Sequence, residues 1–195
     1  RRPETAAAFA RGSKFESRAA MCFPAAARVR MSHVRRPYGV GRSRVSPLET
    51  YLTELNAIRA TGAMTDETSF YVPLANLLSE IGKELKPRVR CFMGMKNQGA
   101  GMPDGGLFVA DQYEHKSNAA PIPGQPPARG VIEAKPVRDD AWFTAETEQV
   151  TKYWNKYRQV LVTNYRDFVL VGQRDGKPVK LESFRLATNE REFLA

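Results

Sequence analysis

The sequence has few residues that bind soft metals or form covalent cross-links. It contains two cysteines, Cys22 and Cys91, and two histidines, His33 and His115, in 195 residues. These residues do not have the spacing of a zinc site, and a chain of this length does not need a disulfide scaffold. We therefore expect a reducing, cytoplasmic setting. Cys91 lies in an apolar run, which favours a packed core thiol over a reactive one.

Long apolar runs and nucleotide-binding motifs are also absent. No stretch of about 18 apolar residues occurs, so a membrane span is not expected. The glycine-rich segment 99–106 is not followed by Lys-Ser or Lys-Thr, which argues against a phosphate-binding loop. The Asn-Pro-Pro-Tyr motif of adenine methyltransferases is missing, and Asn164-Tyr165 does not replace it.

Positive charge is in excess, but its distribution is uneven. The net charge of +9 equals the charge of residues 1–46 alone, which hold eleven Lys or Arg and two Glu. Residues 47–195 are neutral overall, so DNA binding by this part must depend on local clusters of charge. We interpret 1–46 as a basic disordered tail, either solvated or in contact with phosphates, and 47–195 as a single domain.

Helical patterns open the domain. Ser46 and Glu49 form a capping box around Pro47, and apolar residues at helical spacing follow until Gly62. A second helix is predicted around Leu74–Ile81, and it either starts or kinks at Pro73. Helical signals return over residues 144–157.

Strand patterns occupy most of the remaining chain. Strands are predicted over residues 88–95, 107–110, 130–137, 160–162 and 168–171, and Asp175-Gly176 predicts a hairpin turn before a last strand near 179–184. Residues 114–129 are polar and proline-rich, as in a loop. This order predicts an α/β fold in which a mixed central sheet is flanked by helices.

Three residues could form a hydrolytic site on two neighbouring strands. Asp104 begins one strand, and Glu133 and Lys135 share one face of the next because side chains alternate along a strand. Charged residues between apolar neighbours are costly unless they are paired or bind a metal. Two carboxylates suit Mg²⁺, and a nearby lysine can orient or deprotonate a water. The alternatives are an ordinary Pro-Asp-Gly-Gly turn for Asp104 and a plain ion pair on an edge strand for the other two.

A polar row follows on the next predicted helix. Gln149, Lys152, Tyr153 and Lys156 share one helical face, because they are spaced three or four residues apart. Amide, phenol and ammonium groups in a row suit contacts with a phosphate backbone. The alternative is a solvated face on which Tyr153 is half-buried.

Pro103-Asp104, Glu133-Ala134-Lys135 and the pair Gln149 and Tyr153, in this order, resemble the motifs of the PD-(D/E)xK nuclease superfamily. The similarity is to its RecB-like branch, which carries a QxxxY helix. Two further segments, 65–74 and 163–168, look like the nuclease region of type IIG and type ISP restriction enzymes, which are fused to adenine-specific DNA methyltransferases. In these enzymes the first segment is the opening helix. The resemblance covers residues 47–195.

The resemblance implies a restriction-endonuclease-like fold and a role for each matched residue. Asp104, Glu133 and the Ala134 carbonyl would bind Mg²⁺, for which Mn²⁺ would substitute, and Lys135 would position or activate water. Gln149 and Tyr153 would support the site or contact DNA. Glu67 would be the acid that many members carry on the first core helix, although it could equally favour a helix N-terminus by its charge.

These observations lead to the hypothesis of a Mg²⁺-dependent DNA endonuclease from a bacterial restriction–modification system. Its partners would be double-stranded DNA, contacted by Lys152 and Lys156, and a methyltransferase or target-recognition region outside this chain. Two alternatives remain open. The chain could be an inactive nuclease fold used for DNA binding or docking, or an unrelated α/β interaction domain with a basic tail.

Overall fold

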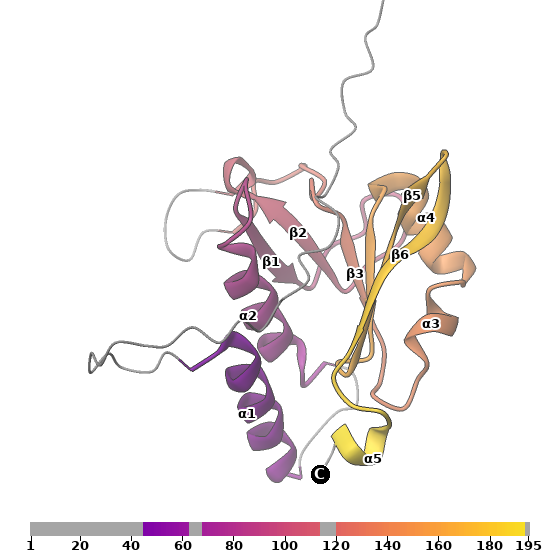
Figure 1. Cartoon of the computed structure of the whole chain (residues 1–195). Helices are drawn as coiled ribbons and strands as arrows, with labels where there is room; N and C mark the ends of the chain where they lie inside the picture. Colours follow the sequence, from indigo (N-terminus) through magenta and orange to yellow (C-terminus); the bar gives the residue numbers. More distant parts are fainter. Residues whose placement is uncertain (1–44, 63–67, 114–119, 194–195) are drawn as a thin grey trace, which may run out of the picture. The chain divides into compact units, whose positions relative to one another are not determined.

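The computed structural model describes residues 45–62, 68–113 and 120–193. Most of the predicted basic tail, and also Glu67, lie outside these ranges. The described part contains a six-stranded sheet in the order β1-β2-β3-β4-β5-β6, with helices on both faces (Figure 1). No helix in this part of the chain is long and apolar enough to cross a membrane.

The first two helices pack on one face of the sheet. Helix α1 (Pro47–Ala60) begins with the predicted capping box at Ser46, whose hydroxyl accepts a hydrogen bond from the Glu49 backbone N–H. Helix α2 (Tyr71–Gly82) carries Pro73 in its first turn, where the missing N–H costs nothing. The prediction that a helix covers 65–74 is therefore wrong over 68–70, which form a turn before α2.

Every pair of neighbouring strands except one is antiparallel. Strand β1 (Val89–Met93) pairs with β2 (Gly105–Val109), which pairs with β3 (Val131–Ala134). Strand β3 is parallel to β4 (Val160–Thr163), and the hairpin of β5 (Asp167–Arg174) and β6 (Lys177–Arg185) completes the sheet. The mixed sheet and the hairpin at Asp175-Gly176 confirm the predicted α/β class.

The parallel pair requires a crossover, and two short helices supply it. Helix α3 (Ala141–Thr144) is capped by the Asp140 carboxylate, and α4 (Glu148–Tyr157) is capped by the Thr147 hydroxyl. The helical signals predicted over 144–157 correspond to the end of α3 and to α4, with a break at 145–147 that the sequence did not predict. Two short elements were not predicted: the 3-10 turn η1 (Ala110–Gln112) and α5 (Glu190–Phe193).

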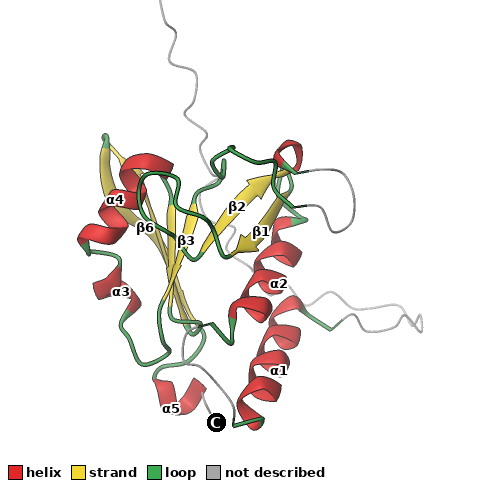
Figure 2. Cartoon of the chain, turned by 180° about the vertical axis from the view of Figure 1, so that it is seen from behind, coloured by secondary structure: helices red, strands yellow, loops and turns green. Residues whose placement is uncertain are grey.

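The sheet lies between α1 and α2 on one side and α3 and α4 on the other (Figure 2). An apolar core fills each side of the sheet. Residues of α3 and α4 pack on Val131 of β3 and on alternate residues of β4 and β5. Residues of α1 and α2 pack on Ile132 and Ala134 from the opposite face. Strand β3 is therefore buried on both sides, and its alternation sets the direction in which Glu133 points.

Candidate active site

The predicted acidic residues meet where β2 begins and β3 ends. Gly105 pairs with Ile132 in the antiparallel register, so Asp104, one residue earlier, lies across from Glu133. The backbone N–H of Ala134 donates a hydrogen bond to Asp104 Oδ2 at 2.7 Å. The Asp104 carboxylate is therefore bound to the neighbouring strand.

The second oxygen of Asp104 is held from α2. The Tyr71 hydroxyl donates a hydrogen bond to Asp104 Oδ1 at 2.6 Å. Sequence reasoning did not identify Tyr71 as a site residue, although it lies in the segment 65–74 that carries the family resemblance.

Glu133 and Lys135 form an ion pair inside the sheet rather than at its edge. Glu133 Oε1 lies 2.6 Å from Lys135 Nζ, and the exposed fractions of the two side chains are 2% and 27%. Strand β3 lies between β2 and β4, so the alternative is correct that the two residues form an ion pair and wrong that they lie on an edge strand. Burial of a charged pair costs desolvation energy, which the attraction between the two charges must offset.

Helix α4 adds Tyr153 to this group. The Gln149 side-chain amide donates a hydrogen bond to the Tyr153 hydroxyl at 3.0 Å, and Tyr153 is only 2% exposed, so it is buried rather than half-buried. Burial raises the pKa of Tyr153. The hydrogen bond from Gln149 opposes that rise, the charges of Glu133 and Asp104 add to it, and the charge of Lys135 opposes it. The phenol therefore stays protonated at neutral pH, and it interacts electrostatically with Asp104, Glu133 and Lys135.

A shallow cleft beside this group is lined by the exposed lysines of α4. Lys152, Asn155 and Lys156 face the loop Gly99–Gly101 across a volume of about 580 Å³. Among the described residues, neither lysine forms an ion pair. Gly101 has φ +103°, and a Cβ there would lie 3.2 Å from the Tyr153 ring, so glycine lets the loop approach α4 closely.

The donor set suits a hard divalent cation with few protein ligands. Among the residues that the structure describes, no cluster of three or more His, Cys, Asp and Glu occurs. Asp104 and Glu133 nevertheless provide two carboxylates, and Mg²⁺ is usually bound by one or two carboxylates, with water and phosphate oxygens completing its shell. The carbonyl of Ala134 lies on the same edge of β3 as its N–H, which faces Asp104. The residues present therefore fit Mg²⁺.

The segment 163–168 supports the site from the end of the sheet. The Asn164 side-chain amide donates hydrogen bonds to the carbonyls of Val137 (3.4 Å) and Asp139 (2.7 Å), in the loop that follows Lys135. Asp167, 1% exposed, binds Arg166 and Arg185. Thr163 also pairs with Ala134, and its carbonyl accepts a hydrogen bond from the Lys135 backbone N–H at 2.8 Å. This segment therefore holds the chain in place where it leaves β3.

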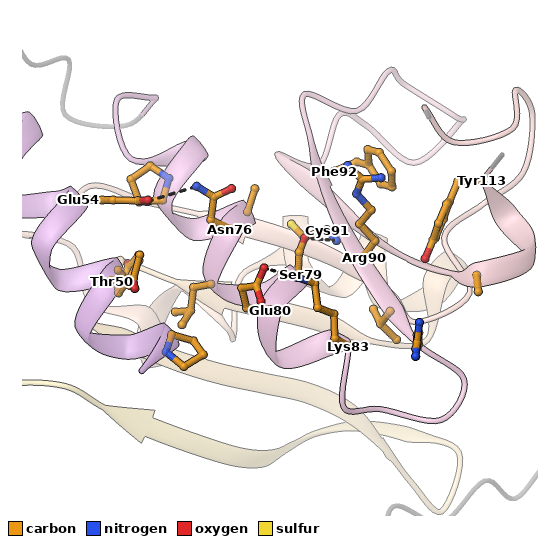
Figure 3. A pocket seen from close by; sticks show the side chains of 18 of the residues that line it. Thr50, Glu54, Asn76, Ser79, Glu80, Lys83, Arg90, Cys91, Phe92 and Tyr113 are labelled. Atoms are coloured by element: carbon orange, nitrogen blue, oxygen red, sulfur yellow. Dashed lines mark hydrogen bonds and ion pairs between the residues drawn. The ribbon is translucent and has the colours of Figure 1, made fainter. Parts of the chain in front are cut away.

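A larger groove lies elsewhere on the domain. It has a volume of about 900 Å³, lies along α1, α2 and β1, and includes Glu54, Arg90 and Tyr113 (Figure 3). None of the predicted site residues lines it. Cys91 borders it but is 5% exposed, and burial raises the pKa of its thiol to about 12. This confirms a packed thiol rather than a reactive one.

Comparison with known proteins identifies the fold but not a family. No protein-family model matches the chain, and no curated protein matches it. One solved structure that does match is described as a cryoEM structure of a DrdV–DNA complex, with a TM-score of 0.50 and 20% sequence identity. The match covers 72% of this chain but only 12% of that chain. The chain therefore has a restriction-endonuclease-like α/β fold, with a mixed central sheet flanked by helices.

Proposed function

We propose that this chain is the nuclease domain of a restriction–modification enzyme and that it hydrolyses DNA phosphodiester bonds with Mg²⁺. One observation carries the proposal. The Asp104 carboxylate is bound to β3 beside the buried Glu133–Lys135 ion pair, so two carboxylates and an ammonium group converge at neighbouring strands. The fold shared with a protein solved in complex with DNA supports a DNA substrate.

Asp104, Glu133 and the Ala134 carbonyl would hold the Mg²⁺ ion, and Mn²⁺ would substitute for it. When bound, the ion supplies Lewis acidity, which polarises the phosphate and favours loss of a proton from water. Glu67 remains the predicted additional acid, but it lies outside the described residues.

Lys135 would orient the attacking water. Its ammonium donates to Glu133, and an ammonium group carries three N–H donors that can orient a water or a phosphate oxygen. The water oxygen bonds to phosphorus and one phosphorus–oxygen ester bond breaks. The leaving oxygen takes up a proton, and the water loses one. Lys135 also stabilises the negative charge that develops on the phosphate in this step.

Helix α4 would place the DNA strand. Lys152 and Lys156 are exposed beside the loop Gly99–Gly101, and they would contact phosphates next to the cleaved bond. Tyr153, hydrogen-bonded to Gln149, would support the position of Lys135. Residues 47–195 carry no net charge, so base recognition would fall to a target-recognition or methyltransferase region outside this chain.

Cleavage of supercoiled plasmid at low salt, with Mg²⁺ or Mn²⁺, tests the proposal. The variants Asp104→Ala and Lys135→Ala should each lose at least about a hundredfold in rate, the usual size of a lost acid–base or charge-stabilising group. Lys177→Ala is the matched control, because this exposed lysine lies in the β5–β6 hairpin, away from the proposed site.

Two other results would point to other functions. If the wild-type chain binds Mn²⁺ through Asp104 and binds DNA but never cuts it, the docking module is favoured. If Mn²⁺ binding is absent, or is unchanged by Asp104→Ala, the nuclease proposal fails and an interaction domain is favoured.

A further inference from the structure

Tyr71 connects α2 to the proposed metal site. Its hydroxyl donates to Asp104 Oδ1 at 2.6 Å, across 33 positions of sequence. Helix α2 packs on β1, the strand next to β2, and so it brings Tyr71 to the start of β2 (Figure 1). The Tyr71 hydroxyl binds Oδ1 of the Asp104 carboxylate, and the Ala134 N–H binds Oδ2.

Glycines lie close to Asp104 in the sequence. Gly105 and Gly106 follow it and Gly101 precedes it by three positions, while the adjacent Pro103 is buried. A Cβ on Gly105 would lie 3.0 Å from the Phe92 backbone oxygen, so this position leaves little room for a side chain. Two hydrogen bonds, from Tyr71 and from Ala134, orient the Asp104 carboxylate.

We propose that Tyr71 is a positioning residue, which holds the Asp104 carboxylate toward Glu133 for metal binding. The inference rests on the proposed function, since the metal site is part of that proposal. One hydrogen bond, from Ala134, fixes one oxygen and leaves the carboxylate free to turn about it. The second bond, from Tyr71, fixes the plane of the group, so that its remaining lone pairs face the space beside Glu133.

The chain offers a closely matched control. Tyr51 on α1 also donates through its hydroxyl to a distant group, the Tyr165 carbonyl, at 2.8 Å. Tyr51 is 1% exposed, and this hydrogen bond joins it to Tyr165 instead of Asp104. Replacing either tyrosine by phenylalanine removes one hydroxyl, but only Tyr71→Phe releases the carboxylate.

The test measures Mn²⁺ binding to the full chain by titration calorimetry, together with thermal melting. Tyr71→Phe should weaken Mn²⁺ binding about fivefold, the size expected for one hydrogen bond. It should also raise, by a similar factor, the Mg²⁺ concentration that gives half-maximal cleavage. Tyr51→Phe should lower the melting temperature and leave Mn²⁺ affinity unchanged. In an Asp104→Asn background, Tyr71→Phe should have no further effect on Mn²⁺ affinity, because the two residues act as one unit.

Failure of this inference can be distinguished from failure of the proposed function. If Asp104→Ala abolishes Mn²⁺ binding but Tyr71→Phe binds as tightly as the wild type, the positioning role is overturned and the nuclease proposal stands. If the wild type does not bind Mn²⁺, the metal site is lost, and a metal-free crystal structure of Tyr71→Phe decides the positioning role. A carboxylate turned away from Glu133 supports that role, and an unmoved carboxylate overturns it.

Discussion

Replacing Lys135 by methionine would test the cost of the buried carboxylate directly. Methionine keeps most of the length of the side chain and removes the ammonium, so the 2.6 Å ion pair with Glu133 is lost. Glu133 is 2% exposed and cannot turn to bulk water without disturbing the sheet. We therefore expect a loss of folding stability that does not depend on whether the chain cuts DNA.

The size of the loss follows from the burial of the two partners. Removing one partner of a buried ion pair costs about 3–5 kcal/mol, because the other charge is left in a medium of low dielectric constant. Lys135 is 27% exposed, so water reaches this end of the pair and the lower limit, about 3 kcal/mol, applies.

Urea denaturation followed by tryptophan fluorescence would measure this loss at pH 7.5. The double variant Glu133→Gln with Lys135→Met should recover most of the stability, because neither position then carries a buried charge. Lys180→Met is the control: its ion pair with Glu146 is exposed, and its loss should cost less than about 1 kcal/mol. Equal stability of Lys135→Met and the wild type, or no recovery in the double variant, would refute the reasoning.

Three further changes have expected outcomes. The DNA association constant should fall less steeply with salt concentration in Lys152→Ala, with the slope of its log–log plot smaller in magnitude by about one. Lys177→Ala should leave this slope unchanged. Equal slopes for Lys152→Ala and the wild type would exclude a phosphate contact at Lys152. Burial raises the pKa of Cys91 to about 12, so unfolding, which frees the thiol to ionise, becomes easier above about pH 9. Cys91→Ala should make the fall in stability less steep by up to about 1.4 kcal/mol per pH unit in urea titrations between pH 9 and 11. Gly101→Ala combines φ +103° with a contact of 3.2 Å to the Tyr153 ring, and it should lower stability by about 1–3 kcal/mol and slow cleavage. Unchanged melting would show that the loop adapts.

Local signals predicted most of the secondary structure because they act over a few residues. The capping box at Ser46 and the turn at Asp175-Gly176 lie where the sequence places them. The break at 145–147 within the helical signals was not predicted, since a threonine within a helical pattern can either continue the helix or cap a new one. Thr147 caps a new one, and α3 and α4 together form the crossover between the parallel strands β3 and β4.

Part of the candidate site was also predicted from signals that act over a few residues. Alternation along a strand places Glu133 and Lys135 on one face, and the ion pair confirms that they are neighbours. The strand pattern also offered Asp104, a shared helical face offered Gln149 and Tyr153, and the resemblance of the motifs grouped them. Their electrostatic contact with one another agrees with this grouping, whereas their roles in catalysis stay predictions.

The sequence by itself determined which residues could form strands, helices and turns, because spacing, capping and chain reversal depend on near neighbours. Only the tertiary structure decided that β3 is a central strand and that Tyr71 reaches Asp104 from another helix. It also decided that the loop Gly99–Gly101 faces the lysines of α4. These contacts join residues far apart in the chain, and no local pattern encodes a distance that depends on how the sheet and helices pack together.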